Sequence, residues 1–565
     1  MIPGAGVART VVSPASGRVL VALVASAVLT VGLASLSTKA RAQSKFGTVH
    51  SVAIPDGEKG RLALLGDLNG DGRSDLVIAS SRRGGAGGRF IRVRSGMAAG
   101  ESEGQGAFTT DPTFELKLTP DAVAVAIGDV HPDPGQELVL FFATAVVAVR
   151  TSASEKDRYA KLGDVDYLFQ LAHPRRVLDA SPHLLDADGD GHVDLVVPEP
   201  NGYRVLLQNR TEEAWTFDRE SRLRVPPTRD PFQGAFRAGA SDGVGNGGAE
   251  GGDSGSSIQL DLGDGDTSGD AFLRVSESVS YLAFVDWDAD GDLDGITQSD
   301  GRFLVFPQEP RGVFASDPTL AFPLPIEDVR SQTLDVSYRA HALDLDADGQ
   351  SDYVMLAGDS QSRRKSKDPR TQVLVFTRKP ARGEAKPAEA PLFGEKGVPD
   401  QLLVLSGFAG GSQFARVDAD GLPDFVVGSL RLDLLDQIRD ALRDSVDIDL
   451  YVYRNEAGRF AKTPSFSHSF RMALDDVETM GDGMAVNFLG DLSGDGTSEL
   501  LLRSRPTQIQ IFMVRAQKDR WSLVDRPLFE MTVEEDARVE VVRPEGGTSR
   551  VLVLEDQAVH HVRFP

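Results

Sequence analysis

The sequence predicts an all-β protein, a β-propeller built of four-stranded blades. A nine-residue acidic turn recurs along the 565-residue chain, short apolar segments of strand length flank it, and its interval fits one blade. A chain of this length exceeds the size at which one compact core stops growing, so it divides into domains or repeats a smaller unit. The recurring turn favours repetition.

The acidic turn occurs seven times, and its copies begin at residues 67, 129, 186, 286, 344, 416 and 491. Successive copies lie 57 to 75 residues apart, with one interval of 100 residues. Such intervals match four short strands plus their loops. Each copy therefore marks one blade.

The segments around the turns read as strands. Leu62–Leu65 precedes the first turn and Leu76–Ile78 follows it, as in a hairpin. A third apolar segment follows in nearly every copy, such as Tyr203–Asn209, and a fourth opens on an aromatic residue such as Trp215. Four strands and little helix in each repeat are typical of a propeller.

An eighth repeat without acidic ligands follows the seventh turn. Gly547–Arg550 aligns with Gly496–Glu499, and Val551–Leu554 and Val559–Phe564 supply two strands. We expect Phe46–Ile54 to add the outer strand of this last blade, because pairing both termini in one blade removes exposed sheet edges. The sequence thus predicts eight blades, with seven as the alternative.

Two insertions interrupt the repeats. Residues 234–270 are rich in Gly, Ser and Asp and have few large apolar residues, so we expect a disordered loop. Residues 430–443 carry apolar residues at helical spacing, which predicts a short helix. The chain contains no cysteine, so no disulfide stabilises it.

The acidic turn has the pattern of a calcium loop. Side-chain oxygens at positions 1, 3, 5 and 9, a backbone carbonyl at position 7 and a glycine at position 6 suit a cation with six to eight oxygen ligands. Five copies keep this pattern. Their predicted ligands are Asp67, Asn69, Asp71, Arg73 and Asp75; Asp186, Asp188, Asp190, His192 and Asp194; Asp286, Asp288, Asp290, Asp292 and Asp294; Asp344, Asp346, Asp348, Gln350 and Asp352; and Asp491, Ser493, Asp495, Thr497 and Glu499.

Two copies depart from the pattern. The turn at Asp129 has His131 at position 3 and lacks the glycine, so its calcium occupancy stays open. The turn at position 416 has Arg416 where the first ligand belongs. We expect the Arg416 guanidinium to take the place of the cation and to pair with Asp418 and Asp420, without calcium.

The N-terminus predicts export. Residues 1–42 carry basic residues and no acid, an apolar stretch from Val19 to Leu36, and an Ala40-Arg41-Ala42 site. This pattern is typical of a cleaved signal peptide. We therefore expect a secreted, periplasmic or cell-surface protein without a membrane span in the mature chain; the alternative is an uncleaved N-terminal anchor.

The segment Gly66–Ile78 resembles the FG-GAP (VCBS-type) repeat, and so does Gly407–Gly428, which keeps a glycine and a phenylalanine upstream. The resemblance covers most of the mature chain. Integrin α-subunit heads are members of that family. The resemblance implies propeller blades whose acidic turns bind Ca²⁺ on one face, and it implies adhesion or recognition only loosely, because related repeats also occur in lectins and beside catalytic domains.

These observations predict a non-catalytic scaffold that binds a protein or a glycan and acts as a monomer. The net charge of -24 argues against nucleic acid as a partner. Gly239–Gly243 and Gly252–Gly255 resemble serine-hydrolase turns but lack the flanking strand and helix, so no catalytic residue is assigned. The alternative function is a carbohydrate-active lyase or hydrolase with its site in the propeller channel.

Overall fold

The computed structural model describes most of the chain beyond the N-terminal segment. The described residues are 46–82, 88–97, 107–168, 178–180, 183–211, 215–225, 256–262, 271–277, 282–287, 290–299, 302–309, 312–323, 336–348, 352–359, 370–377, 399–406, 408–430, 445–473, 486–517, 520–542 and 549–564. Within these ranges no residue belongs to an α-helix. The all-β prediction is confirmed.

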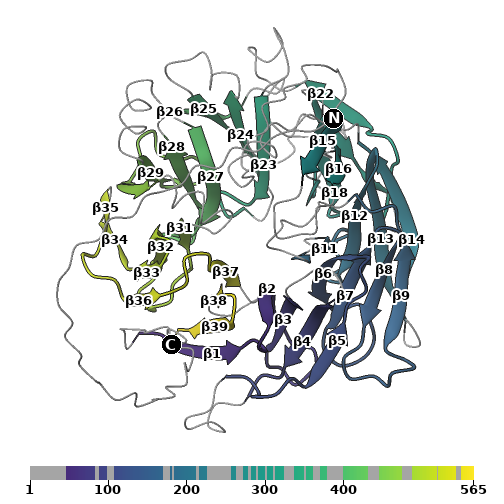
Figure 1. The fold of residues 1–565 in the computed structure, drawn as a ribbon. Coiled ribbons are helices and arrows are strands. Elements are labelled where there is room, and N and C mark those ends of the chain that lie inside the picture. Colours follow the sequence, from purple (N-terminus) through teal and green to yellow (C-terminus); the bar gives the residue numbers. More distant parts are fainter. Residues whose placement is uncertain are drawn as a thin grey trace, which may run out of the picture. The chain divides into compact units, whose positions relative to one another are not determined.

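The strands form eight antiparallel four-stranded blades, numbered here in chain order (Figure 1). Blade 1 consists of β2 (Glu58–Gly66), β3 (Asp75–Arg82), β4 (Arg89–Arg94) and β5 (Phe114–Lys117). Blade 2 consists of β6 (Ala122–Gly128), β7 (Glu137–Phe142), β8 (Ala145–Val149) and β9 (Tyr159–Asp164), with β10 (Asp179–Ala180) pairing parallel to β6. Blade 3 consists of β11 (Leu184–Leu185), β12 (Asp194–Glu199), β13 (Gly202–Arg210) and β14 (Trp215–Arg224). Blade 4 consists of β17 (Ala283–Val285), β18 (Asp294–Ser299), β19 (Arg302–Phe306) and β22 (Leu320–Pro323).

The second half of the chain repeats the arrangement. Blade 5 consists of β23 (Val336–Leu343), β24 (Asp352–Asp359), β25 (Arg370–Phe376) and β26 (Gln401–Ser406). Blade 6 consists of β27 (Phe408–Ala415), β28 (Asp424–Leu430), β29 (Ser445–Tyr453) and β30 (Phe466–Ala473). Blade 7 consists of β31 (Val486–Phe488), β32 (Leu500–Arg505), β33 (Gln508–Phe512) and β36 (Phe529–Thr532). Blade 8 consists of β37 (Arg538–Val542), β38 (Arg550–Leu554), β39 (Ala558–Arg563) and β1 (Thr48–Ala53).

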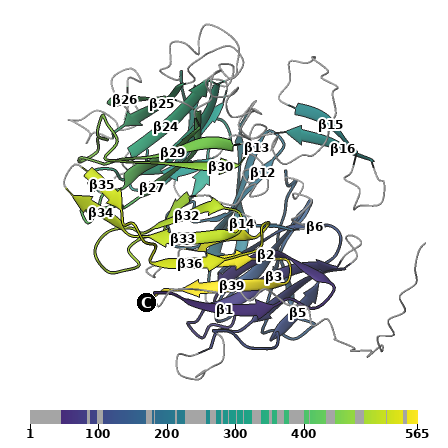
Figure 2. The ribbon, with the colours of Figure 1, turned by 60° about the vertical axis from the view of Figure 1, so that its left-hand side comes forward.

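The N-terminal strand completes the last blade, as predicted. β1 pairs antiparallel with β39 from Thr48 opposite Arg563 to Ala53 opposite Ala558. The two strands lie side by side in both views (Figures 1 and 2). The eight-blade prediction is therefore confirmed, and the seven-blade alternative is wrong.

Apolar side chains hold consecutive blades together. One buried cluster joins Ile91 of blade 1 to Leu138 of blade 2, and another joins Val205 of blade 3 to Phe306 of blade 4. Because neighbouring blades cover both faces of the sheet, the second strand β3 is buried almost throughout, with only Arg82 exposed. Each blade is thereby held in place by the blades on both sides.

Every acidic turn joins the first strand of its blade to the second. The ninth residue of the turn is the first residue of the second strand, or directly precedes it in blade 7. The turn position is therefore fixed by the sheet pairing on both sides, and the seven turns occupy equivalent places in seven blades.

The insertions differ in part from expectation. Within 234–270, Ser256–Leu262 forms β15, which pairs with β16 (Ala271–Glu277), so the expected disorder is wrong for this stretch. Ile258, Leu260 and Leu262 alternate as in a strand, but the glycine-rich composition of the surrounding sequence predicted disorder. Residues 234–255 and 263–270 lie outside the described residues. The predicted helix lies outside them too, apart from Leu430, and so does the predicted signal peptide. Two further short hairpins pair β20 (Gln308–Glu309) with β21 (Val313–Phe314) and β34 (Val514–Gln517) with β35 (Arg520–Leu523).

None of the described residues forms a helix that is long and apolar enough to cross a bilayer.

Candidate metal centres

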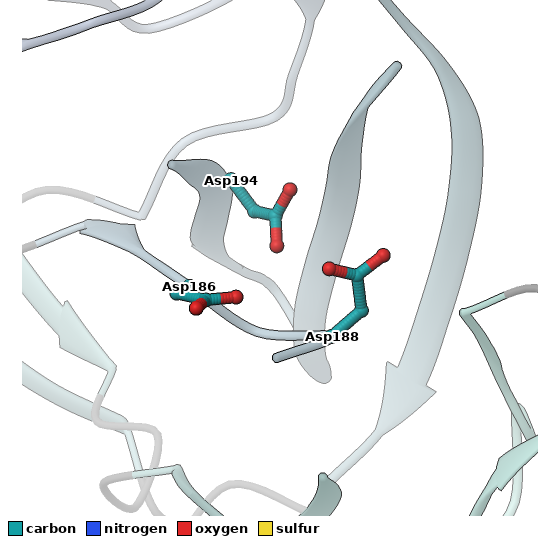
Figure 3. A group of neighbouring side chains, drawn as sticks. All are labelled: Asp186, Asp188 and Asp194. Atoms are coloured by element: carbon teal, nitrogen blue, oxygen red, sulfur yellow. The ribbon is translucent and has the colours of Figure 1, made fainter. Parts of the chain in front are cut away.

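Among the described residues, the carboxylates converge in three of the turns. In blade 3, carboxylate oxygens of Asp186, Asp188 and Asp194 all lie within 4.8 Å of one another, and the three side chains point toward a common centre (Figure 3). The same convergence is found in blade 5 for Asp344, Asp346 and Asp348, and in blade 7 for Asp491, Asp495 and Glu499. The turns thus bring together residues that the sequence predicts as ligands of one cation.

The first residue of the turn organises the backbone. In blade 3 the two carboxylate oxygens of Asp186 accept hydrogen bonds from the backbone N–H groups of Gly189 (2.8 Å) and Gly191 (3.0 Å). In blade 7, Asp491 accepts them from Gly494 (2.6 Å) and Gly496 (2.8 Å). This capping folds the turn around the carboxylate and leaves its remaining lone pairs for a cation.

The glycine at position 6 serves the backbone geometry that the sequence predicts. Gly191 has a φ of 82° and Gly496 a φ of 88°, a left-handed conformation that glycine adopts without steric cost. The bend turns successive side chains inward. The glycine therefore allows one short turn to surround a single point.

The ninth residue is a buried structural anchor. The side chain of Asp194 is fully buried and accepts hydrogen bonds from the N–H groups of Ala187 (2.8 Å) and Gln208 (2.7 Å). Asp294 makes the equivalent pair with Trp287 (2.9 Å) and Gln308 (2.8 Å). Burial raises the pKa of Asp194 to about 7, because a charged carboxylate is costly away from water. A bound cation would favour the ionised form.

Two turns contain buried oxygens with no regular hydrogen bond. Asp346 Oδ1 in blade 5 and Glu499 Oε1 in blade 7 are each buried without such a partner, as is Ser493 Oγ beside Glu499. Buried polar atoms are nearly always satisfied, so these oxygens fit direct ligands of a cation. The donor set is oxygen alone, which suits Ca²⁺ better than a transition metal.

The turns in blades 1 and 3 each contain an ion pair with an arginine, and in blade 3 Arg219 Nη2 lies 3.2 Å from Asp188 Oδ2. In blade 1, the Arg73 guanidinium forms an ion pair with Asp71 (Nη2 to Oδ2, 2.6 Å), while Asp67 accepts hydrogen bonds from Gly70 and Gly72 as the first residue does in blades 3 and 7. The predicted ligands are therefore present, but Asp71 carries a competing cation. In blade 4, Asp288 lies outside the described residues, as does Gln350 in blade 5.

The turns of blades 1, 5 and 6 also contact the following blade. The Asn455 Nδ2 group of blade 6 donates to the Leu345 carbonyl in the blade 5 turn (2.7 Å), and Thr151 Oγ1 of blade 2 donates to the Leu68 carbonyl in blade 1 (3.2 Å). The backbone N–H of Ser498 in blade 7 donates to the Val417 carbonyl in blade 6 (3.0 Å). A cation that orders one turn would thus also stabilise the junction between two blades.

The predicted role of Arg416 is wrong. Arg416 is exposed, and the guanidinium that pairs with Asp418 and Asp420 belongs to Arg454. Arg416 follows β27 as the first residue of the turn and its side chain is exposed, whereas Arg454 directly follows β29 and reaches the turn from there. The turn sequence itself gives no signal for Arg454, because this residue lies at the end of the third strand, outside the turn.

The comparisons with known proteins give only distant similarities. No family model matches the chain, and no curated protein matches it. Among solved structures, the chain is similar to the V. cholerae biofilm matrix protein Bap1, with 12% identity, 92% of this chain and 88% of that chain covered, and a TM-score of 0.37. It is also similar to an Agrocybe aegerita lectin specific for non-reducing terminal N-acetylglucosamine (11% identity, 91% and 96% covered, TM-score 0.33) and to the exotype rhamnogalacturonan lyase YesX (11%, 91% and 75%, TM-score 0.33). At these values the similarities carry no argument about function.

Proposed function

We propose that the chain is an exported β-propeller that Ca²⁺ stabilises and that serves as a non-catalytic scaffold for binding a protein or glycan partner. The supporting observation is the convergence of three carboxylates in each of the turns of blades 3, 5 and 7. The five predicted calcium turns are those beginning at Asp67, Asp186, Asp286, Asp344 and Asp491.

Electrostatic repulsion supports a cation in these turns. Two carboxylates about 5 Å apart repel each other by about 3 kcal/mol at an effective dielectric constant of about 20. A divalent ion reverses the sign of this energy. Ca²⁺ accepts the irregular oxygen shell of a turn, whereas Mg²⁺ requires a tight octahedron and retains water. The proposal therefore names Ca²⁺.

The expected stabilisation is modest for each site. Extracellular calcium modules bind with dissociation constants of about 0.1 to 1 mM. At about 1 mM calcium, a site of about 0.1 mM adds about 1.4 kcal/mol to the free energy of unfolding. Several such sites together are comparable with the whole stability of a domain.

The hydrogen bonds of the turn carboxylates support a structural role more than a catalytic one. The carboxylates of Asp186 and Asp194 accept hydrogen bonds from backbone N–H groups of the protein itself, those of Gly189 and Gly191 and those of Ala187 and Gln208. The turns are distributed over successive blades and do not form one cluster. Calcium in this account orders the surface that a partner contacts, and the partner binds to the loops around it.

A binding array tests the proposal. The purified mature chain is applied to protein and glycan arrays in calcium and in EGTA, with Asp186→Asn/Asp188→Asn as the site variant. The double variant Asp218→Asn/Asp317→Asn removes the same charge from exposed positions outside the turns and serves as the control. We expect calcium-dependent binding that the site variant weakens and the control retains.

A parallel assay addresses catalysis. Any array ligand is incubated with the chain, and its cleavage is followed by the mass of the products. An unchanged ligand supports a binding protein. Turnover would contradict the non-catalytic proposal, and the absence of any ligand on both arrays would contradict the binding role.

A further inference from the structure

Arg150 and Arg454 occupy equivalent places in two blades. Arg150 directly follows β8, whose last residue Val149 pairs with Leu138, the residue after the ninth position of the blade 2 turn. Arg454 directly follows β29, whose last residue Tyr453 pairs with Phe425 in the same way in blade 6. Both arginines therefore stand opposite the ninth residue of their turn.

The Arg454 side chain reaches two carboxylates of the blade 6 turn. Its Nε lies 2.9 Å from Asp418 Oδ2, and its Nη2 lies 3.1 Å from Asp420 Oδ2. These are positions 3 and 5, which hold cation ligands in the regular turns. The Asp418 side chain is only 9% exposed, so the guanidinium balances a largely buried charge.

The blade 2 turn is neutralised in a similar manner. Arg150 Nε lies 2.6 Å from Asp133 Oδ2 at position 5, and its Nη1 donates to the Asp157 carbonyl (3.0 Å). The first residue, Asp129, pairs with Arg210 of blade 3 at 3.1 Å. Positions 1 and 5 of this turn thus each face a guanidinium.

The five regular turns have no arginine at this place. In each of those blades, the equivalent residue is the one after the last residue of the third strand that pairs with the second strand. These residues are Ser95, Leu207, Pro307, Thr377 and Met513. Among the blades with an acidic turn, arginine is found at this position only in blades 2 and 6, the two blades whose turns have an incomplete ligand pattern. Arg73 and Arg219 contact one carboxylate each, Asp71 and Asp188, but they start from other positions.

We propose that Arg150 and Arg454 are built-in cations that replace the metal ion in blades 2 and 6, so that these two turns keep their shape without calcium. An arginine is always charged and presents a planar fork of donors that matches carboxylates. The inference rests on the proposed calcium role of the other turns. It predicts that removing the guanidinium and restoring the first ligand creates a new metal site.

The experiment counts calcium ions per chain by equilibrium dialysis. The wild type is compared with Arg416→Asp/Arg454→Thr, which restores position 1 and introduces the threonine that blade 5 has at the equivalent place. Arg416→Asp/Arg454→Lys keeps a positive charge there and is the matched control. We expect one additional calcium ion in the threonine variant and none in the lysine variant.

A second variant keeps the inference testable if the first does not fold. Asp418→Asn/Asp420→Asn in the otherwise native chain should leave the number of bound ions unchanged, whereas Asp186→Asn/Asp188→Asn should lower it by one. A loss of one ion from Asp418→Asn/Asp420→Asn would overturn the inference, as would a folded threonine variant without the additional ion.

The outcomes separate this inference from the proposed function. A wild type that binds no calcium contradicts the proposed function. If the threonine variant then binds one ion, the role of Arg454 is still supported. A wild type that binds calcium, together with a threonine variant that gains no ion, contradicts the inference alone.

Discussion

Ser51 of the N-terminal strand and His560 of the C-terminal strand form a hydrogen bond of 2.8 Å between Oγ and Nδ1. The His560 Nε2 atom lies 2.9 Å from Glu555 Oε2, and Glu555 Oε1 accepts the backbone N–H of Glu534 (2.8 Å). Because Ser51 and His560 are direct cross-strand partners, this chain of contacts fastens β1 to blade 8.

Removal of β1 should open the propeller. A chain that starts at Ile54 lacks β1, which pairs with one edge of β39, whereas a chain that starts at Phe46 retains β1. The freed edge of β39 offers unpaired backbone groups to a second molecule. We expect a lower melting temperature and concentration-dependent association for the shorter chain in light scattering. Equal melting and a monomeric state in both chains would show that β1 does not close the fold.

Asp194 should be needed for stability even without calcium. The Asp194→Asn variant keeps one acceptor oxygen and replaces the other with a donor, so one of the N–H groups of Ala187 and Gln208 loses its bond. A buried unsatisfied donor costs about 1 to 3 kcal/mol. The exposed Asp190→Asn is the matched control. Denaturant unfolding in EGTA should show the loss only for Asp194→Asn.

The stability should depend on pH through the ninth residues of the arginine-containing turns. Burial raises the pKa of Asp424 from 3.8 to about 7, and it raises the pKa of Glu137 from 4.5 to about 7. At a pH between the ordinary pKa of each group and about 7, this group holds a proton in the folded chain and has released it in the unfolded chain. The free energy of unfolding should therefore fall as pH rises toward about 7, and this contribution should level off above it.

Melting temperatures in EGTA at several pH values check this dependence. Asp424→Asn cannot titrate, so the stability difference between the wild type and this variant should narrow as pH rises to about 7. If this difference widens with pH, the ionised Asp424 beside Arg454 stabilises the folded chain more than the protonated Asp424 does.

Asn455 should couple blade 6 to the turn of blade 5. Its side chain is 1% exposed, donates to the Leu345 carbonyl (2.7 Å) and accepts the N–H of Gly458 (3.0 Å). Asn455→Ala leaves both groups unsatisfied, with an expected loss of about 1 to 3 kcal/mol. Because Leu345 belongs to the blade 5 turn, calcium titration should also show weaker binding. Unchanged affinity with lower stability would limit Asn455 to a packing role.

The repeated acidic turn allowed the fold to be predicted from the sequence. Seven acidic turns at blade-length intervals predicted the blades, and Phe46–Ile54 predicted the closing strand, because both features are local and periodic. The cation beside Asp418 was misassigned because Arg454 lies far from Asp418 in the sequence and is brought beside it by the pairing of β29 with β28. The hairpin at Ile258 was missed because composition outweighed its alternation.

We propose that the regular acidic turns bind calcium and that this calcium stabilises the propeller. The most direct test is the melting temperature of the wild type in about 1 mM calcium and in EGTA, together with the number of calcium ions bound per chain at saturation. We predict five bound ions and a lower melting temperature in EGTA, with the Asp186→Asn/Asp188→Asn variant one ion short. A chain that binds no calcium and melts at the same temperature in both buffers would contradict the account.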